Sequence, residues 1–201
     1  MSLPHPPRAG HGKHPAAPAT ASHFHWLKTG AHALAEMLAA IAHAKENIRL
    51  EMYIIQPDAQ GEKFRDALTA AARRGVRVRV LADAFGSMYL KPDFGHALIA
   101  AGVEFRYFNL PGEGRSALRD HRKLMICDDA RAFVGGLNIG GEYAGDGVAA
   151  GWRDLGLEFQ GTLAGELGRA FDEMFELAEF RHPRFAWLRH AIRQRRLEAE
   201  S

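Results

Sequence analysis

Hydrophobic and polar residues alternate with two different periods along the chain. Apolar residues at helical spacing predict a helix from Ala31 to Lys45, and strict alternation then predicts a strand over Asn47–Ile55. The two patterns repeat further on, and they predict a helix over Gly61–Arg73, a strand over Val76–Ala82, a helix over Phe94–Ala101, strands over Val103–Phe108 and Arg153–Gln160, and helices over Leu163–Glu179 and Arg184–Glu198. This order is typical of an α/β fold in which helices cover a largely parallel sheet.

A β-hairpin is predicted within this order, and it would make the sheet mixed. The run Arg122–Cys127 is mostly apolar and is followed by two aspartates, as expected of a short buried strand that ends in a turn. If Asp128–Arg131 forms the turn, Cys127 pairs with Ala132.

Three side chains suited to binding a phosphate group fall together in this hairpin. Residues two apart in a strand point the same way, so His121 and Lys123 share a face. The predicted register brings Asn138 back opposite His121. The sequence therefore predicts that these three residues converge.

Asp128 has a different place in the hairpin. It lies an odd number of residues from His121 and, at the rise of a strand, roughly 16 Å from Lys123. It cannot be the local ion partner of that lysine. We predict a supporting residue whose carboxylate accepts hydrogen bonds from nearby backbone N–H groups.

The pattern His-x-Lys-x4-Asp-x6-Gly-Gly-x-Asn, which starts at His121 and ends at Asn138, resembles the HKD signature of the phospholipase D superfamily. The glycine at position 136 is similar to the form found in bacterial cardiolipin synthases. Upstream segments such as AIAHAKENIRLEMY and AARRGVRVRVLADAFG read like the N-terminal half of such an enzyme, so the resemblance runs from about Trp26 to Phe180.

The resemblance implies a phospholipase D-like mixed β-sheet with helices on both faces and one HKD domain. It implies that His121 is the nucleophile of a phosphohistidine intermediate, that Lys123 and Asn138 hold the phosphate, and that Asp128 belongs to the catalytic motif. Attack by an imidazole on phosphorus, with cations neutralising the phosphoryl oxygens, requires no metal or other cofactor. Asp154 is the candidate acceptor for the second ring nitrogen of the nucleophile.

Four further residues are expected to contact or support the substrate. Gly135 and Gly136 let the backbone approach a ligand closely, although a bulge would use them equally well. Glu51 resembles an acidic position of the family and is expected to organise the site from below. Arg119, on a basic Gly-rich loop, is expected to steer an anionic lipid or nucleic acid, and a merely solvated loop is the alternative.

Composition divides the chain into three parts. Of its 201 residues 47% are hydrophobic and the net charge is +2, as in a globular protein. Residues 1–25 are rich in Pro, Ala and His and predict a disordered tail, residues 26–180 the catalytic domain, and residues 181–201 a basic amphipathic helix. That helix would lie on an anionic bilayer or pack on a partner subunit.

The location of the protein is expected from two features of the sequence. No apolar run approaches the roughly 20 residues of a membrane-spanning helix, so membrane contact is expected to be peripheral. The single cysteine, Cys127, allows no internal disulfide and fits a reducing compartment. We expect a cytoplasmic protein that is peripheral at the inner membrane.

Enzymes of this superfamily use two such motifs in one site, whereas this sequence contains one. A homodimer, or a second HKD half, would supply the second histidine. The sequence favours a phosphatidyltransferase of cardiolipin-synthase type acting on an anionic phospholipid. The alternatives are a metal-independent phosphodiesterase or endonuclease of the same superfamily, with nucleic acid as partner, and an inactive half-enzyme.

Overall fold

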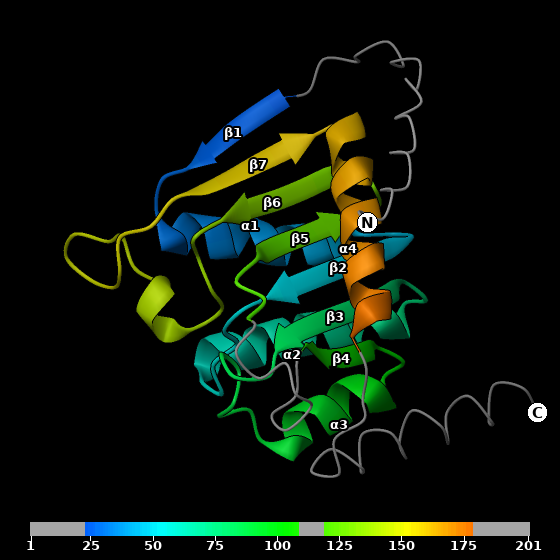
Figure 1. Cartoon of the computed structure of the whole chain (residues 1–201). Helices are drawn as coiled ribbons and strands as arrows, with labels where there is room; N and C mark the ends of the chain where they lie inside the picture. Colours follow the sequence, from blue (N-terminus) through cyan, green and yellow to red (C-terminus); the bar gives the residue numbers. More distant parts are fainter. Residues whose placement is uncertain (1–22, 109–118, 179–201) are drawn as a thin grey trace, which may run out of the picture.

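The computed structural model describes residues 23–108 and 119–178. Figure 1 shows a sheet with helices on both of its faces. The strands are β1 (His23–Leu27), β2 (Asn47–Met52), β3 (Arg77–Asp83), β4 (Glu104–Phe108), β5 (Lys123–Cys127), β6 (Arg131–Gly135) and β7 (Gly156–Gln160). The helices are α1 (Gly30–His43), α2 (Ala59–Arg73), α3 (Pro92–Ala100), the 3₁₀ turn η1 (Gly141–Tyr143) and α4 (Thr162–Leu177).

The described elements agree in order with the sequence pattern, and several of the predicted boundaries fall elsewhere. The strand predicted over Arg153–Gln160 begins at Gly156. The strand predicted to end at Ile55 ends at Met52. Residues 23–25, which were assigned to a disordered tail, form part of the edge strand β1. The rest of the predicted tail and the predicted helix over 181–201 lie outside the described residues.

The sheet has seven strands in the order β1-β7-β6-β5-β2-β3-β4. Strands β2, β3 and β4 are parallel to one another, and β5, β6, β7 and β1 each pair antiparallel with their neighbours. The predicted mixed sheet is therefore confirmed. Because β5 runs against β2, the start of β5 lies at the same edge of the sheet as the ends of β2 and β3.

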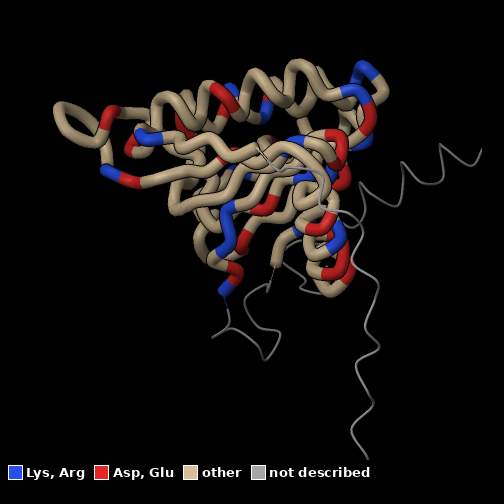
Figure 2. The backbone as a smooth tube through the Cα atoms, turned by 90° about the horizontal axis from the view of Figure 1, so that it is seen from above, with Lys and Arg blue, Asp and Glu red and all other residues tan. Residues whose placement is uncertain are grey.

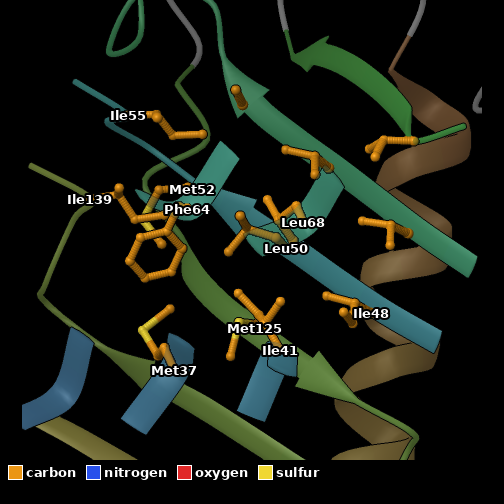
Figure 3. Close-up of a cluster of buried hydrophobic side chains, with 14 of the residues drawn as sticks. Met37, Ile41, Ile48, Leu50, Met52, Ile55, Phe64, Leu68, Met125 and Ile139 are labelled. Atoms are coloured by element: carbon orange, nitrogen blue, oxygen red, sulfur yellow. The ribbon is translucent and has the colours of Figure 1, made fainter. Parts of the chain in front are cut away.

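One face of the sheet carries the larger apolar core. Strand β2 alternates as predicted, and Ile48, Leu50 and Met52 point into this core, where they are at most 1% exposed. Figure 3 shows these side chains packed against Phe64 and Leu68 of α2 and against residues of α1. Burial of aliphatic side chains at roughly 1.5–3 kcal/mol each is the main favourable contribution to this layer.

The opposite face is covered by α4 and contains buried charges. Figure 2 shows the layers from above, with charged residues along the strands of the sheet as well as along the helices. Asp172 of α4 accepts two hydrogen bonds from Arg49, at 2.8 and 3.1 Å, and forms an ion pair with Arg79 at 2.8 Å. Phe171 and Phe175 lie beside the Arg79 guanidinium and belong to the second apolar cluster. These contacts fasten α4 across strands β2 and β3.

The hairpin forms, but its register differs from the prediction by one residue. Cys127 pairs with Arg131 rather than with Ala132. Both Asp128 and Asp129 adopt left-handed backbone angles, with φ of 54° and 52°, and the Ala130 N–H returns to the Cys127 carbonyl at 3.1 Å. Two left-handed residues make a tight turn whose twist suits a β-hairpin, so the loop closes one residue early. The predicted position of Asn138 directly opposite His121 is consequently wrong.

Candidate functional site

The candidate site lies at the sheet edge where the parallel strands β2 and β3 end and where β5 and β7 begin (Figure 1). His121 and Lys123 lead into β5 at this edge. The Lys123 ammonium lies 3.0 Å from Nδ1 of His121 and donates a second hydrogen bond to the His121 carbonyl at 2.8 Å. The predicted shared face of the two residues is confirmed. His121 is exposed, whereas Lys123 is buried.

The surroundings of Lys123 shift its pKa in opposite directions. Burial lowers the pKa of Lys123, and the negative charges of Asp154, Asp120 and Asp83 oppose that shift. The aromatic ring of Tyr53 adds a cation–π contact, with the ammonium 4.9 Å from the ring centroid. A cation in such a partly dry pocket is well suited to stabilise an anion.

Tyr53 also contacts the histidine. It follows the end of β2, and its ring centroid lies 4.4 Å from that of His121. The backbone carbonyl of Tyr53 accepts a hydrogen bond from Ser87 at 3.1 Å, and the Ser87 hydroxyl accepts one from the Ile55 N–H at 3.0 Å. The loop after β3 therefore fixes the loop after β2, and with it one side of the imidazole.

Asn138 reaches the same edge but is largely occupied by protein partners. It is 3% exposed. Its Oδ1 accepts a hydrogen bond from the Ile54 N–H at 3.1 Å, and its Nδ2 donates to the Tyr143 hydroxyl at 2.7 Å. One amide hydrogen remains for another acceptor. Asn138 thus joins the segment after β6 to the segment after β2.

Gly135 and Gly136 are required by close packing against the segment that leads into β7. A Cβ atom on Gly135 would lie 2.4 Å from the Leu155 carbonyl oxygen. A Cβ atom on Gly136 would lie 2.2 Å from a carboxylate oxygen of Asp154. The second glycine therefore leaves room for the carboxylate of Asp154 at this edge.

Asp154 interacts with the charge of Lys123, but the predicted hydrogen bond to the histidine is not observed. Its Oδ1 accepts a hydrogen bond from the Leu155 N–H at 2.7 Å. Nδ1 of His121 contacts Lys123 instead. The charge of Asp154 acts on Lys123 and is the first of the three carboxylates that hold up its pKa.

Glu51 occupies the interior of β2 beneath the site. Its side chain is fully buried, and Oε2 accepts a hydrogen bond from the Arg122 guanidinium at 2.6 Å. Burial and the neighbouring Asp120 raise the pKa of Glu51 to about 9, although Arg122 opposes the shift. Glu51 therefore contacts Arg122, the residue after His121, and does not face the open edge.

Asp83 is a site residue that the sequence pattern did not single out. Its Oδ1 accepts hydrogen bonds from the N–H groups of Phe85 and Gly86, at 2.9 and 2.8 Å, and its Oδ2 accepts one from the Asp120 N–H at 2.9 Å. The sequence signal that could have identified Asp83 is an aspartate at the end of a buried strand, followed two residues later by Phe-Gly in a turn. Asp83 anchors the backbone directly before His121.

Arg119 lies at the sheet edge that forms the candidate site, whereas Asp128 lies at the opposite end of β5. The Arg119 guanidinium lies over the Phe85 ring, 4.3 Å from its centroid, at the active edge. Asp128 lies at the far end of β5, where its carboxylate accepts hydrogen bonds from the backbone N–H groups of Lys45, Glu46 and Asn47 at 2.9, 2.8 and 3.0 Å. Burial raises the pKa of Asp128, but these hydrogen bonds outweigh it and lower the pKa overall. The predicted backbone contacts of Asp128 are confirmed.

Residues 23–108 and 119–178 contain no group of three or more His, Cys, Asp or Glu side chains placed to hold a metal ion. No helix in these ranges has the length and apolar character needed to cross a bilayer.

The fold and the His121–Lys123 pair define an HKD domain of the phospholipase D class. The family model described as "Cardiolipin synthase, PLD-like domain" matches residues 37–145, and the chain belongs to this family. The match covers β2 to η1 and therefore includes the whole motif.

The relatives with known names include much longer proteins. The chain is 41% identical over 135 residues to the major cardiolipin synthase ClsA of Bacillus subtilis (strain 168), and the match covers 63% of this chain and 27% of that protein. The matched part lies in the N-terminal half of such relatives, as predicted. The chain therefore spans about a quarter of the length of this relative.

Two solved structures share the fold over nearly their whole length. NucT from Helicobacter pylori has a TM-score of 0.61 at 14% identity, and the likeness covers 78% of this chain and 97% of that one. The phospholipase D family member Nuc from Salmonella typhimurium has a TM-score of 0.57 at 21% identity, with 81% and 99% covered. These likenesses confirm the predicted phospholipase D-like α/β fold.

Proposed function

We propose that this chain is one catalytic half of a phosphatidyltransferase, in which His121 carries the phosphatidyl group as a phosphohistidine. The observation that carries the proposal is the contact between the Lys123 ammonium and Nδ1 of His121 at the open edge of the sheet. A nucleophilic imidazole with a buried cation beside it has the parts needed to attack phosphorus and neutralise the oxygens around it.

The first step forms a bond from His121 to phosphorus and breaks the bond from phosphorus to an oxygen of the donor lipid. Lys123 contacts Nδ1 of the imidazole, so a protonated lysine places the ring proton on Nε2. A phosphate that binds the ammonium draws Lys123 away from the ring. The ring proton then moves to Nδ1, where Asp154 is the proposed acceptor, which leaves the Nε2 electron pair for attack.

The second step transfers the phosphatidyl group to an alcohol. The acceptor oxygen attacks phosphorus, the bond to His121 breaks, and the imidazole is regenerated. Both steps require a group that gives a proton to the leaving oxygen and later takes one from the attacking alcohol. Among the described residues, His121 is the only histidine that belongs to an HKD motif. A second half-site therefore supplies the group that donates and accepts the proton.

Exposed apolar side chains at the active edge support a second half-site there. Phe85, Met88 and Tyr89 follow β3, and Val148 and Trp152 precede β7, with exposures from 46% to 86%. Apolar side chains that gather around a charged site favour cover by another protein surface. We propose a homodimer or a second HKD half that meets this edge across the two histidines.

The kind of substrate follows from the family. Membership in the cardiolipin synthase family supports an anionic phospholipid as donor and a glycerol-type alcohol as acceptor. The alternative is a metal-independent phosphodiesterase or endonuclease of the same superfamily, in which two single-motif chains would cleave other phosphodiesters, including those of nucleic acid. We further propose that the protein works at the cytoplasmic surface of the inner membrane without spanning it, helped by the basic residues in 181–201.

A parallel assay separates these substrates. Purified protein receives labelled phosphatidylglycerol and plasmid DNA in separate reactions, both in EDTA. The proposal predicts a diphosphatidyl product with release of glycerol, and loss of this product in His121→Ala. Cleavage of DNA without lipid transfer would favour the endonuclease. If neither substrate reacts at any protein concentration, the chain is an inactive half-enzyme and the proposal is wrong for this form.

A further inference from the structure

Two buried carboxyl groups meet beneath His121. The side chains of Glu51 and Asp120 are 0% and 4% exposed. One oxygen of each has a donor: the Arg122 guanidinium reaches Oε2 of Glu51 at 2.6 Å, and the Arg122 backbone N–H reaches Oδ1 of Asp120 at 3.2 Å. The other two oxygens, Oε1 of Glu51 and Oδ2 of Asp120, are buried without a donor among the described residues.

A shared proton accounts for both unpartnered oxygens. Two ionised carboxylates can only accept hydrogen bonds, so neither can satisfy the other. Buried polar atoms without partners are rare because their desolvation is not compensated. The two side chains lie within hydrogen-bonding reach of each other. One proton turns one of the carboxyls into a donor and satisfies both oxygens at once.

We propose that Glu51 and Asp120 share one proton at neutral pH, and that the pair positions His121. Asp120 precedes His121 and Arg122 follows it. Arg122 donates a hydrogen bond to Glu51 in the middle of the sheet, and the shared proton would bond Asp120 to the same Glu51. The Asp120 N–H is also fixed on Asp83 at 2.9 Å. Both neighbours of the histidine are therefore tied to buried groups. The positioning role rests on the proposed function, whereas the shared proton does not.

The charges around the pair favour the shared proton. Burial, followed by Asp120, raises the pKa of Glu51 to about 9, and Arg122 is the cation that opposes this. Arg49 and Arg79 lie on the same sheet face but are paired with Asp172 of α4.

The remaining charged neighbours do not compensate a second negative charge. Arg106 of β4 is directed to Glu176 and the Phe175 carbonyl of α4. Asp83 adds a further carboxylate next to Asp120. The Lys123 ammonium contacts His121, and its charge is shared among Asp154, Asp120 and Asp83. A second buried negative charge would therefore lack a cation of its own.

The shared proton has a definite pH dependence. The pKa of Glu51 in the folded protein, about 9, lies above its ordinary value of 4.5. The stability that this proton contributes is thus complete below about pH 4.5 and is lost as the pH rises through about 9. The wild-type protein should lose stability from pH 6 to pH 9 relative to a variant in which an amide replaces the shared proton.

Infrared spectroscopy tests the proton directly. Protein labelled with ¹³C at the glutamate and aspartate carboxyl carbons, in separate samples, should show the C=O stretch of a protonated carboxylic acid at pH 7. The band should disappear as the pH passes about 9 and should be absent in Asp120→Asn. A wild-type spectrum with only ionised carboxylates at pH 7 would overturn the proposal, and this experiment needs no variant.

Two amide variants give an independent readout. In Asp120→Asn the amide donates to Oε1 of Glu51, and in Glu51→Gln it donates to Oδ2 of Asp120, so each keeps the contact without a titrating proton. The Tm of each should rise relative to wild type as the pH increases from 6 to 9. Asp66→Asn, at an exposed carboxylate paired with Arg65, is the matched control and should show no such trend. Equal pH profiles for all four proteins would contradict the shared proton.

Activity tests the positioning role separately. Asp120→Ala should lower kcat about tenfold with little change in KM, because His121 loses its anchor. Asp120→Asn should recover most of that loss and should extend activity to higher pH. If Asp120→Ala turns over like wild type, the positioning role is wrong. If no form shows activity, the proposed function fails, while the infrared and Tm results still decide the shared proton.

Discussion

The two ends of strand β5 carry polar side chains of the same motif and use them differently. At the turn, both oxygens of Asp128 are bonded to backbone N–H groups of the segment before β2. At the active edge, His121 and Lys123 are bonded mainly to each other. A group held by backbone donors cannot exchange partners without breaking the fold, whereas two side chains bonded to each other can. One motif thus contains a reacting end and a supporting end.

The comparison predicts the largest effect at the histidine. His121→Ala removes the proposed nucleophile, and transfer should fall by about 10⁴-fold or more, as for other enzymes that lose a nucleophile. The fold should be retained because the imidazole is exposed. Steady-state transfer rates with Tm measured in parallel test this. Transfer at the wild-type rate would mean that the reacting end lies elsewhere.

Lys123→Ala should have the next largest effect. Loss of a preorganised cation is expected to lower kcat by roughly 10²–10³-fold, about 3–4 kcal/mol of barrier. Lys123→Arg keeps the charge but not the short reach to Nδ1 of His121, so it should recover only part of the rate. A Lys123→Ala protein that changes KM alone would indicate a role in binding only.

Gly136→Ala should have a smaller effect that acts through Asp154. The new Cβ atom would lie 2.2 Å from the carboxylate, so Asp154 must move and its support of the Lys123 charge must change. We expect a roughly 10- to 100-fold lower kcat, the range for a displaced catalytic group. Gly165→Ala on α4 is the matched control, since its Cβ atom would meet nothing closer than 3.7 Å. Equal rates for the two variants would remove Asp154 from the site.

Asp128→Ala should have the smallest effect on rate and a clear effect on stability. It removes three hydrogen bonds and places alanine at a left-handed φ of 54°, so the free energy of unfolding should fall by about 2 kcal/mol. The rate per folded molecule should stay within about threefold of wild type. Because the pKa of Asp128 is lowered, its stabilisation is present above the ordinary value and is lost as the pH falls through the folded value.

Asp128→Asn sharpens this test. Asparagine tolerates left-handed backbone angles but keeps only one acceptor oxygen, so the variant should be intermediate in stability. Urea denaturation of both variants at pH 7 and pH 4 would measure the difference. A large loss of kcat in either folded variant would contradict the supporting role of Asp128.

Sequence pattern predicted most of the fold because apolar residues recur at strand and helix spacing along its central elements. In strand β2, Ile48, Leu50 and Met52 alternate with Arg49 and Glu51, and the three apolar side chains belong to the larger core. Strand β1 does not stand out in the sequence, because its residues before Leu27 are exposed and directly follow the Pro-, Ala- and His-rich segment. The hairpin register depended on left-handed angles at both Asp128 and Asp129, which alternation does not encode.

The candidate site was predicted where contacts are local and missed where they cross the sheet. His121 and Lys123 are two residues apart, so strand geometry alone places them together. The bonds of Asp83 to Asp120 and of Asn138 to Ile54 join distant segments and depend on strand order. The order of strands in a sheet is decided by tertiary packing, which a single sequence pattern does not reveal.

The most direct test of the central claim is to trap the covalent intermediate. Labelled phospholipid is mixed rapidly with wild-type protein, His121→Ala and Asp128→Asn, and each reaction is quenched without acid to preserve a phosphoramidate. Mass spectrometry of the peptides should find the phosphatidyl adduct on His121 in wild type and in Asp128→Asn, and no adduct in His121→Ala. An adduct on another residue, or an undiminished adduct in His121→Ala, would contradict the assignment of His121 as the nucleophile.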